Sequence, residues 1–314
     1  MAEITRRQFL VLGAEFAALM GLSASAIPKV AEALEQLSSG GAPVLWLQGL
    51  SCSGCSVSLL NSETPEIDDI LTQYISLLFH STLSTATGEV AMEVINSTIE
   101  HGGYYLAIEG SMPIGMPEAC KVGEEPVTQQ VLRAAGNAQA VVNVGTCAAF
   151  GGIPAAENNQ TGAVSVGEFL KSENVSVPMI NLPGCPTHPD WIVGTLVHVL
   201  KFGLPALDSD GRPTMFYAKP VHDDCPRYSY YEEQQFAEVF SDEGCLYKLG
   251  CLGPIAHADC TLRQWNGGMS FCMKAGAPCI ACTDKDLASR TAFPFYLKQY
   301  PDLGENLLKQ RTKT

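Results

Sequence analysis

Short apolar stretches alternate with longer amphipathic ones over the first two thirds of the chain. The apolar stretches have the length and composition of buried strands, and the amphipathic ones repeat their apolar residues at helical spacing. The strand-like runs cover residues 44–48, 104–108, 140–144 and 177–182, and helical patterns lie around residues 66–79, 127–135 and 191–200. Parallel strands need long crossover connections, which are usually helices. The pattern therefore predicts an α/β fold with a parallel sheet.

Three of the strand-like runs end in a glycine-containing turn that carries cysteine. Cys52 and Cys55 follow the first run, Cys147 follows the third, and Cys185 follows the fourth. Ligands of open parallel sheets sit beyond the carboxyl ends of the strands, so we expect these thiols to converge on one edge. Four thiolates can hold zinc or an iron-sulfur cluster, and their spacing alone does not separate the two. The need for three distant loops favours a cluster.

The segment after Lys201 concentrates further ligands. It is rich in glycine and proline, shows little strand or helix periodicity, and cannot bury enough apolar surface by itself. We expect metal sites to replace part of its core, as happens in small metal-dependent domains. Eight residues, enough for two more sites, are the candidates: His222, Cys225, Cys245, Cys251, Cys260, Cys272, Cys279 and Cys282.

The first forty residues differ from the rest. Arg6 and Arg7 lie in the sequence TRRQFL, and an apolar run from 11 to 27 follows, interrupted only by Glu15. This is typical of a twin-arginine export signal. The run is short for a membrane span, and a central glutamate is costly in lipid. An amphipathic helix is the alternative. Twin-arginine export carries folded proteins, so cysteines can already bind metal before export. Disulfides therefore become the minor expectation, and Cys120 is the cysteine most expected to form one.

The composition limits the classes of macromolecule that this chain is expected to bind. Hydrophobic residues make up 46% of the chain and charged ones 17%, as in a well-buried globular protein. The formal net charge is −14, with 33 acidic residues against 19 Lys and Arg. Phosphate binding needs clustered basic residues, so this balance argues against nucleic acid and allows a basic protein partner.

A series of motifs extends through the chain. They are WLQG before CSGCSVSLLN, EGS at 109–111, GTCAAFGGIPAA at 145–156, PGCPTHPDW at 183–191, DSDGRP at 208–213, HDDC at 222–225 and WNGG at 265–268. In these motifs the chain resembles the small subunits of nickel-iron hydrogenases, from the arginine pair to about residue 296. The resemblance implies a signal segment at 1–40, a flavodoxin-like parallel-sheet domain at 41–205, and a smaller, mostly irregular iron-sulfur domain at 206–314.

The same resemblance implies a function. A hydrogenase large subunit would carry the nickel-iron site, and this chain would pass electrons to an external acceptor, such as a multihaem cytochrome or a membrane-bound subunit. The twin-arginine segment implies a periplasmic location, or the outer face of the cytoplasmic membrane.

The resemblance also implies three [4Fe-4S] clusters and their ligands. They are Cys52, Cys55, Cys147 and Cys185 for the proximal cluster, His222, Cys225, Cys245 and Cys251 for the distal one, and Cys260, Cys272, Cys279 and Cys282 for the medial one. Many family members have proline where Cys272 stands and hold a medial [3Fe-4S] cluster; cysteine there implies four irons, as in the nickel-iron-selenium branch. Gly54 stands where oxygen-tolerant relatives have an additional cysteine, which argues against their modified proximal cluster.

Some alternatives stay open. A standalone iron-sulfur carrier or a quinone-oxidoreductase subunit would share the first cysteine set but need not have the later one, and a zinc-stapled interaction protein would fit the cysteine count. Among single residues, we expect His188 to be a hydrogen-bonding turn residue and Cys120 a structural thiol. Glu109 is either a proton-path or interface carboxylate or a buried strand-end residue.

Overall fold

The structure is a computed structural model. It describes residues 10–287 except 12, 15, 16, 19, 20, 22, 31–40, 64, 157, 158 and 241. The chain divides into two compact units, Met1–Met215 and Phe216–Thr314. The arginine pair, parts of the apolar run after it, and the end of the resemblance beyond residue 287 lie outside the described residues.

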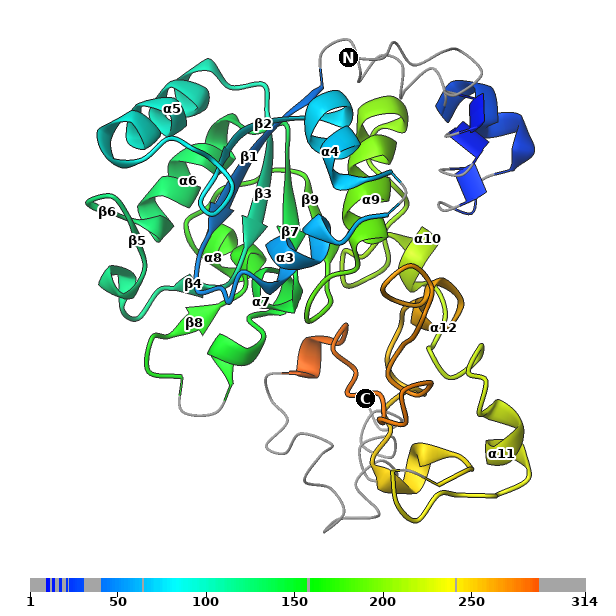
Figure 1. Ribbon diagram of the computed structural model, residues 1–314. Helices are drawn as coiled ribbons and strands as arrows, with labels where there is room; N and C mark the ends of the chain where they lie inside the picture. Colours follow the sequence, from blue (N-terminus) through cyan, green and yellow to red (C-terminus); the bar gives the residue numbers. More distant parts are fainter. Residues whose placement is uncertain are drawn as a thin grey trace. The chain divides into compact units, whose positions relative to one another are not determined.

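A parallel sheet of five strands forms the centre of the first unit (Figure 1). Its strands are β1 (Ala42–Gln48), β2 (Ile75–His80), β3 (Tyr105–Glu109), β7 (Ala140–Val144) and β9 (Met179–Leu182). They are ordered β2-β1-β3-β7-β9, and all four neighbouring pairs are parallel. Counted along the chain this is the order 2-1-3-4-5, that of flavodoxin-like sheets. The predicted α/β fold class is confirmed.

One predicted helix is largely wrong. Residues 66–79 form a short helix α4 (Ile67–Asp69), one π-helical turn (Ile70–Tyr74), and then the edge strand β2. The segment has apolar residues at helical spacing, but strand β1 offers an open edge whose backbone groups need partners. Pairing of β2 with that edge overrides the local pattern. The crossover helix between β2 and β3 is α5 (Gly88–His101), which the pattern did not predict.

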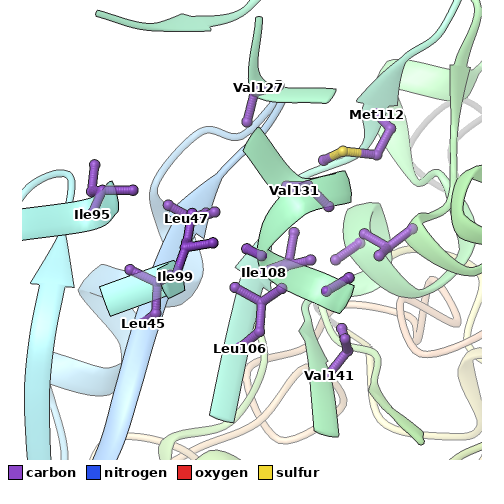
Figure 2. Close-up of a cluster of buried hydrophobic side chains, with 14 of the residues drawn as sticks. Leu45, Leu47, Ile95, Ile99, Leu106, Ile108, Met112, Val127, Val131 and Val141 are labelled. Atoms are coloured by element: carbon purple, nitrogen blue, oxygen red, sulfur yellow. The ribbon is translucent and has the colours of Figure 1, made fainter. Parts of the chain in front are cut away.

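Three helices cover one face of the sheet. They are α5, α6 (Val127–Asn137) and α8 (Val166–Ser172). Ile95 and Ile99 of α5 are buried, and so is Val131 of α6. Each lies one helical turn from another buried residue of its helix, which is the spacing of an apolar stripe. Figure 2 shows these side chains packed against Leu47 and Leu106 of the sheet, within one continuous core. Helix α8 begins with a capping box between Ser165 and Glu168.

Helices α4 and α9 (Pro189–Phe202) lie on the other side of the sheet (Figure 1). Helix α3 (Gly54–Leu60) contacts α9. His188 is the N-cap of α9, and its Nδ1 accepts a hydrogen bond from the backbone N–H of Asp190 at 3.1 Å. The expectation that His188 is a hydrogen-bonding turn residue is confirmed.

Smaller elements complete the first unit. Helix α7 (Thr146–Phe150) follows β7 directly. Two small antiparallel pairs join β4 (Met112–Pro113) to β8 (Ala163–Val164) and β5 (Lys121–Val122) to β6 (Glu125–Pro126). Short 3₁₀ turns lie at Ala24–Ala26, Pro117–Ala119 and Ile153–Ala155.

The loop after residue 205 belongs to the first unit. Asn181 on β9 donates through its backbone N–H to the carbonyl of Gly211 and through its side-chain amide to that of Asp210, both at 2.8 Å. The division between the units therefore falls after Met215 rather than after residue 205. The assignment of a separate role to each domain stays a prediction.

The second unit has little regular structure in its described part, residues 216–240 and 242–287. Helix α10 (Thr214–Tyr217) enters it, and α11 (Tyr228–Glu232) and α12 (Cys260–Arg263) follow, with 3₁₀ turns at Leu246–Leu249 and Lys285–Leu287. Those residues form isolated β-bridges but no strand. In neither unit does a described helix combine the length and apolar character that crossing a membrane requires.

We predict that Leu106→Ala lowers the free energy of unfolding by about 2–5 kcal/mol, because it opens a cavity in the centre of the sheet core. Leu106 is fully buried. The matched control is Val90→Ala on α5, where the side chain is 59% exposed and the expected change is within about 0.5 kcal/mol. Urea unfolding followed by circular dichroism measures both, and equal effects of the two variants would contradict the assigned core.

Candidate metal centres

The ends of four parallel strands stand in register. Gln48 of β1 pairs with Glu109 of β3, which pairs with Val144 of β7, and this residue pairs with Leu182 of β9. The loops that follow these strands therefore leave the sheet side by side. Each cysteine of the first predicted group lies on one of these loops or in the first turn of the helix after it.

The structure brings these four cysteines together. Cys55 lies in the first turn of α3 and Cys147 in the first turn of α7. The Cys147 thiol interacts electrostatically with Cys52 and Cys185. Cys55 in turn interacts with Cys147. Neighbouring thiols on three separate loops are the arrangement that the strand ends predicted.

Glycines leave room around the sulfur atoms. A Cβ added to Gly145 would lie 2.7 Å from the Cys55 sulfur, and one added to Gly54 would lie 3.1 Å from that of Cys52. At Gly152 an added Cβ would lie 2.8 Å from the Cys147 sulfur. Gly145 and Gly152 also have φ angles of +94° and +55°, which side chains disfavour. Any side chain at these positions would fill the space beside the thiols.

Burial makes free thiolates unfavourable here. It raises the pKa of Cys147 to about 11 and that of Cys185 above its ordinary value, and the neighbouring thiols add to both shifts. Burial, with the nearby Glu109 carboxylate, also raises the pKa of Cys55 strongly. Metal cations deprotonate coordinating thiols and supply the missing positive charge. The donor set and the glycine-lined space therefore both fit a metal group.

In the second unit, the first predicted ligand group lines one hollow. His222, Cys225, Cys245 and Cys251 all lie on its wall, together with Tyr247 and Met273. Cys251 interacts electrostatically with Cys225 and Cys245, and burial raises its pKa to about 11. Aromatic rings surround the imidazole of His222: the centroid of Tyr228 lies 5.0 Å and that of Tyr231 4.6 Å from it.

The other predicted group of the second unit is also assembled. Cys260 interacts electrostatically with Cys282 and Cys272, and Cys279 interacts with Cys282 and Cys260. Cys272 thus lies with the group in which the resemblance placed it. The two groups are joined through the backbone, because the N–H of Cys279 donates to the Cys251 sulfur at 3.3 Å.

Cys120 stands apart from the three groups. It is half-buried, and its thiol lies 3.9 Å from the carbonyl oxygen of Gln48. None of the twelve cysteines forms a disulfide. Within the described residues, no three His, Cys, Asp or Glu side chains are spaced for a single metal ion.

Sequence reasoning missed two residues beside the thiols. His80 joins through Ser56 to the Glu109 carboxylate next to Cys55. Trp265 donates a side-chain hydrogen bond to Cys260. Both depend on contacts between distant segments; the WNGG motif at 265–268 was the only local signal. Of the two roles considered for Glu109, burial at a strand end is confirmed, since its side chain is 2% exposed.

Comparison with known families gives two matches. A family described as "NADH ubiquinone oxidoreductase, 20 Kd subunit" matches residues 52–199, and the family of the C-terminal part of the NiFe/NiFeSe hydrogenase small subunit matches residues 217–296. The first match covers the sheet unit alone. The second covers the cysteine-rich segment, which a quinone-oxidoreductase subunit need not have.

Curated relatives match over nearly the whole chain. The periplasmic [NiFeSe] hydrogenase small subunit of Desulfomicrobium baculatum is 40% identical, over 94% of this chain and 99% of its own length. The periplasmic [NiFe] hydrogenase small subunit of Solidesulfovibrio fructosivorans is 37% identical, over 93% of each chain.

Among solved structures, a chain of the [NiFeSe] hydrogenase from Dm. baculatum matches with a TM-score of 0.78 and 42% identity, covering 81% of this chain and 98% of that one. A chain of the recombinant [NiFeSe] hydrogenase from Desulfovibrio vulgaris Hildenborough gives a TM-score of 0.78 and 43% identity, covering 82% and 98%. Sheet order, cysteine placement and full-length similarity agree, and the chain belongs to the family of small subunits of nickel-iron and nickel-iron-selenium hydrogenases.

Proposed function

We propose that this chain is the electron-transfer subunit of a heteromeric hydrogenase, an H₂:acceptor oxidoreductase whose nickel-iron or nickel-iron-selenium site lies in a partner large subunit. The observation that carries the proposal is the grouping of twelve candidate ligands into three sets of four in a member of this family. When bound, three [4Fe-4S] clusters would supply the one-electron redox steps between the large subunit and an external acceptor.

Each set has a proposed place in this relay. The proximal site would be held by Cys52, Cys55, Cys147 and Cys185, the medial one by Cys260, Cys272, Cys279 and Cys282, and the distal one by His222, Cys225, Cys245 and Cys251. The hydrogen bond from the Cys279 N–H to the Cys251 sulfur supports adjacent medial and distal sites. A medial [3Fe-4S] cluster is the less favoured alternative, because Cys272 lies within its group.

The protein's own contribution is to position the thiolates and to set their surroundings. Thr187 donates its backbone N–H to the Cys55 sulfur at 3.5 Å, and Ala281 donates likewise to Cys279 at 3.4 Å. Hydrogen bonds to sulfur stabilise negative charge there and are among the factors that set cluster potentials. Burial of Cys55 and Cys279 limits the access of water to those two sulfurs.

Exposed apolar side chains beside the proximal loops support a large protein partner there. Val57 and Leu60 on α3, close to Cys55, are 55% and 40% exposed, and Ile153, just after α7, is 50% exposed. We assign this face to the large subunit. An obligate interface of this kind buries on the order of 2,000 Å² or more.

The acceptor would take electrons from the distal site. Asp223 and Glu232 act electrostatically on His222, and the chain as a whole is acidic. This charge favours a basic acceptor, with a multihaem cytochrome or a membrane-bound subunit as the two candidates. We further propose export by the twin-arginine route, to the periplasm or to the outer face of the cytoplasmic membrane. The reason is the sequence TRRQFL, which is followed by an apolar run.

Metal analysis tests the relay. The purified heteromeric complex should contain about twelve irons and about twelve acid-labile sulfides per copy of this chain, beyond the iron of the large subunit. Dissociation of the subunits should leave nickel with the partner only. Stoichiometric zinc in place of iron and sulfide would overturn the proposal.

We predict that Gly145→Ala lowers the iron content by about four per chain, because its Cβ would lie against the Cys55 sulfur and its φ angle is unfavourable for alanine. Gly136→Ala on α6 is the control, since an added Cβ there meets no atom within 4 Å. Iron is measured on both variants after identical purification. Full iron in Gly145→Ala would contradict the proximal assignment.

Cys272→Pro should convert the medial site from four irons to three. The expected result is a loss of about one iron per chain and the appearance of the EPR signal of an oxidised three-iron cluster. Cys120→Ser serves as the control and should change neither readout, because Cys120 belongs to none of the three groups. An unchanged spectrum in Cys272→Pro would show that Cys272 is not a ligand.

A further inference from the structure

The Glu109 carboxylate lies fully enclosed beneath the first turn of helix α3, at the end of strand β3. Its Oε1 accepts hydrogen bonds from the backbone N–H groups of Cys55 at 3.0 Å and Ser56 at 3.4 Å. Its Oε2 accepts one from the Ser56 hydroxyl and one from the Gln48 side-chain amide at 3.0 Å. Four donors thus occupy both oxygens. All four partners donate, so both carboxylate oxygens act only as acceptors in these bonds.

The neighbouring histidine supplies no positive charge to this carboxylate. His80 accepts a hydrogen bond from the backbone N–H of Thr82 at Nδ1, 3.1 Å away, which places its single proton on Nε2, facing the Ser56 hydroxyl at 3.0 Å. Burial lowers the pKa of His80 to about 4, although Glu109 acts in the opposite direction, so the imidazole is neutral near pH 7. Within the described part of the chain, no Lys or Arg forms an ion pair with Glu109.

The carboxylate lies against one of the proposed proximal ligands. Glu109 Oε1 is 3.0 Å from the backbone nitrogen of Cys55. A buried charge acts through a lower effective dielectric than a surface charge does, so its influence on the same site is larger. Adding an electron to a cluster beside such a charge is correspondingly unfavourable.

We propose that Glu109 is a positioning residue that fixes the backbone at Cys55 and whose uncompensated carboxylate lowers the reduction potential of the proximal cluster. The inference rests on the proposed function, since it presupposes a cluster on Cys52, Cys55, Cys147 and Cys185. It assigns Ser56 and Gln48 to holding the carboxylate in place. His80 completes the network as a neutral hydrogen-bond partner of Ser56.

The test is Glu109→Gln in the complete heteromeric hydrogenase. The amide keeps one oxygen for the Cys55 and Ser56 N–H groups, and the Gln48 side chain can rotate to accept from the new NH₂ group. We expect the midpoint potential of the proximal cluster, followed by potentiometric EPR titration, to rise by about 59 mV, a tenfold change in the equilibrium of a one-electron couple. Glu89→Gln removes an equal charge from the exposed start of α5 and should leave the potential unchanged.

An unchanged potential in Glu109→Gln with full iron content would overturn this inference alone, whereas absence of iron from the wild-type complex would overturn the proposed function. If Glu109→Gln fails to retain the cluster, the reduction potential of the proximal cluster in Ser56→Ala provides the test. That variant removes one donor but keeps the charge, so its potential should lie at or below that of the wild type. A potential above the wild-type value would overturn the inference.

Discussion

The alignment of four parallel strand ends is the constraint on which the first unit depends. Gln48, Glu109, Val144 and Leu182 stand side by side, so the chain leaves the sheet at four neighbouring points. The apolar strands fix this register, because a shift by one residue would exchange the side chains packed against the helices on the two sides of the sheet. Three of the exits deliver cysteines, and the fourth delivers Glu109, which binds the backbone at Cys55. One sheet edge thereby provides both the proposed ligand set and the carboxylate beside it.

The second unit is organised differently, with little regular secondary structure. Its described part has short helical turns and no strand, and its polar backbone is tied by isolated bridges. Two groups of thiols lie in it, one of them with an imidazole, and Cys245, Cys251 and Cys279 among them are buried. Buried thiols with raised pKa values gain their stable ionised state from metal. We therefore infer that cluster binding and folding of this unit are coupled.

The sequence predicted what repeats locally and missed what depends on distant contacts. Strands β1, β3, β7 and β9 were predicted because each is a short apolar run before a glycine turn. Strand β2 was predicted as helix, since only the open edge of β1 makes it a strand. The three thiol groups followed from strand ends and from the family resemblance. The link from His80 through Ser56 to Glu109 could not be predicted, because it joins segments 24 and 53 residues apart whose polar residues have no local pattern.

Iron anomalous diffraction from crystals of the heteromeric complex tests the three-cluster relay most directly. We predict three iron positions in this chain: one among Cys52, Cys55, Cys147 and Cys185, one among His222, Cys225, Cys245 and Cys251, and one among Cys260, Cys272, Cys279 and Cys282. Each should refine to about four irons. Fewer than three positions, or iron bound by a different set of residues, would contradict the relay.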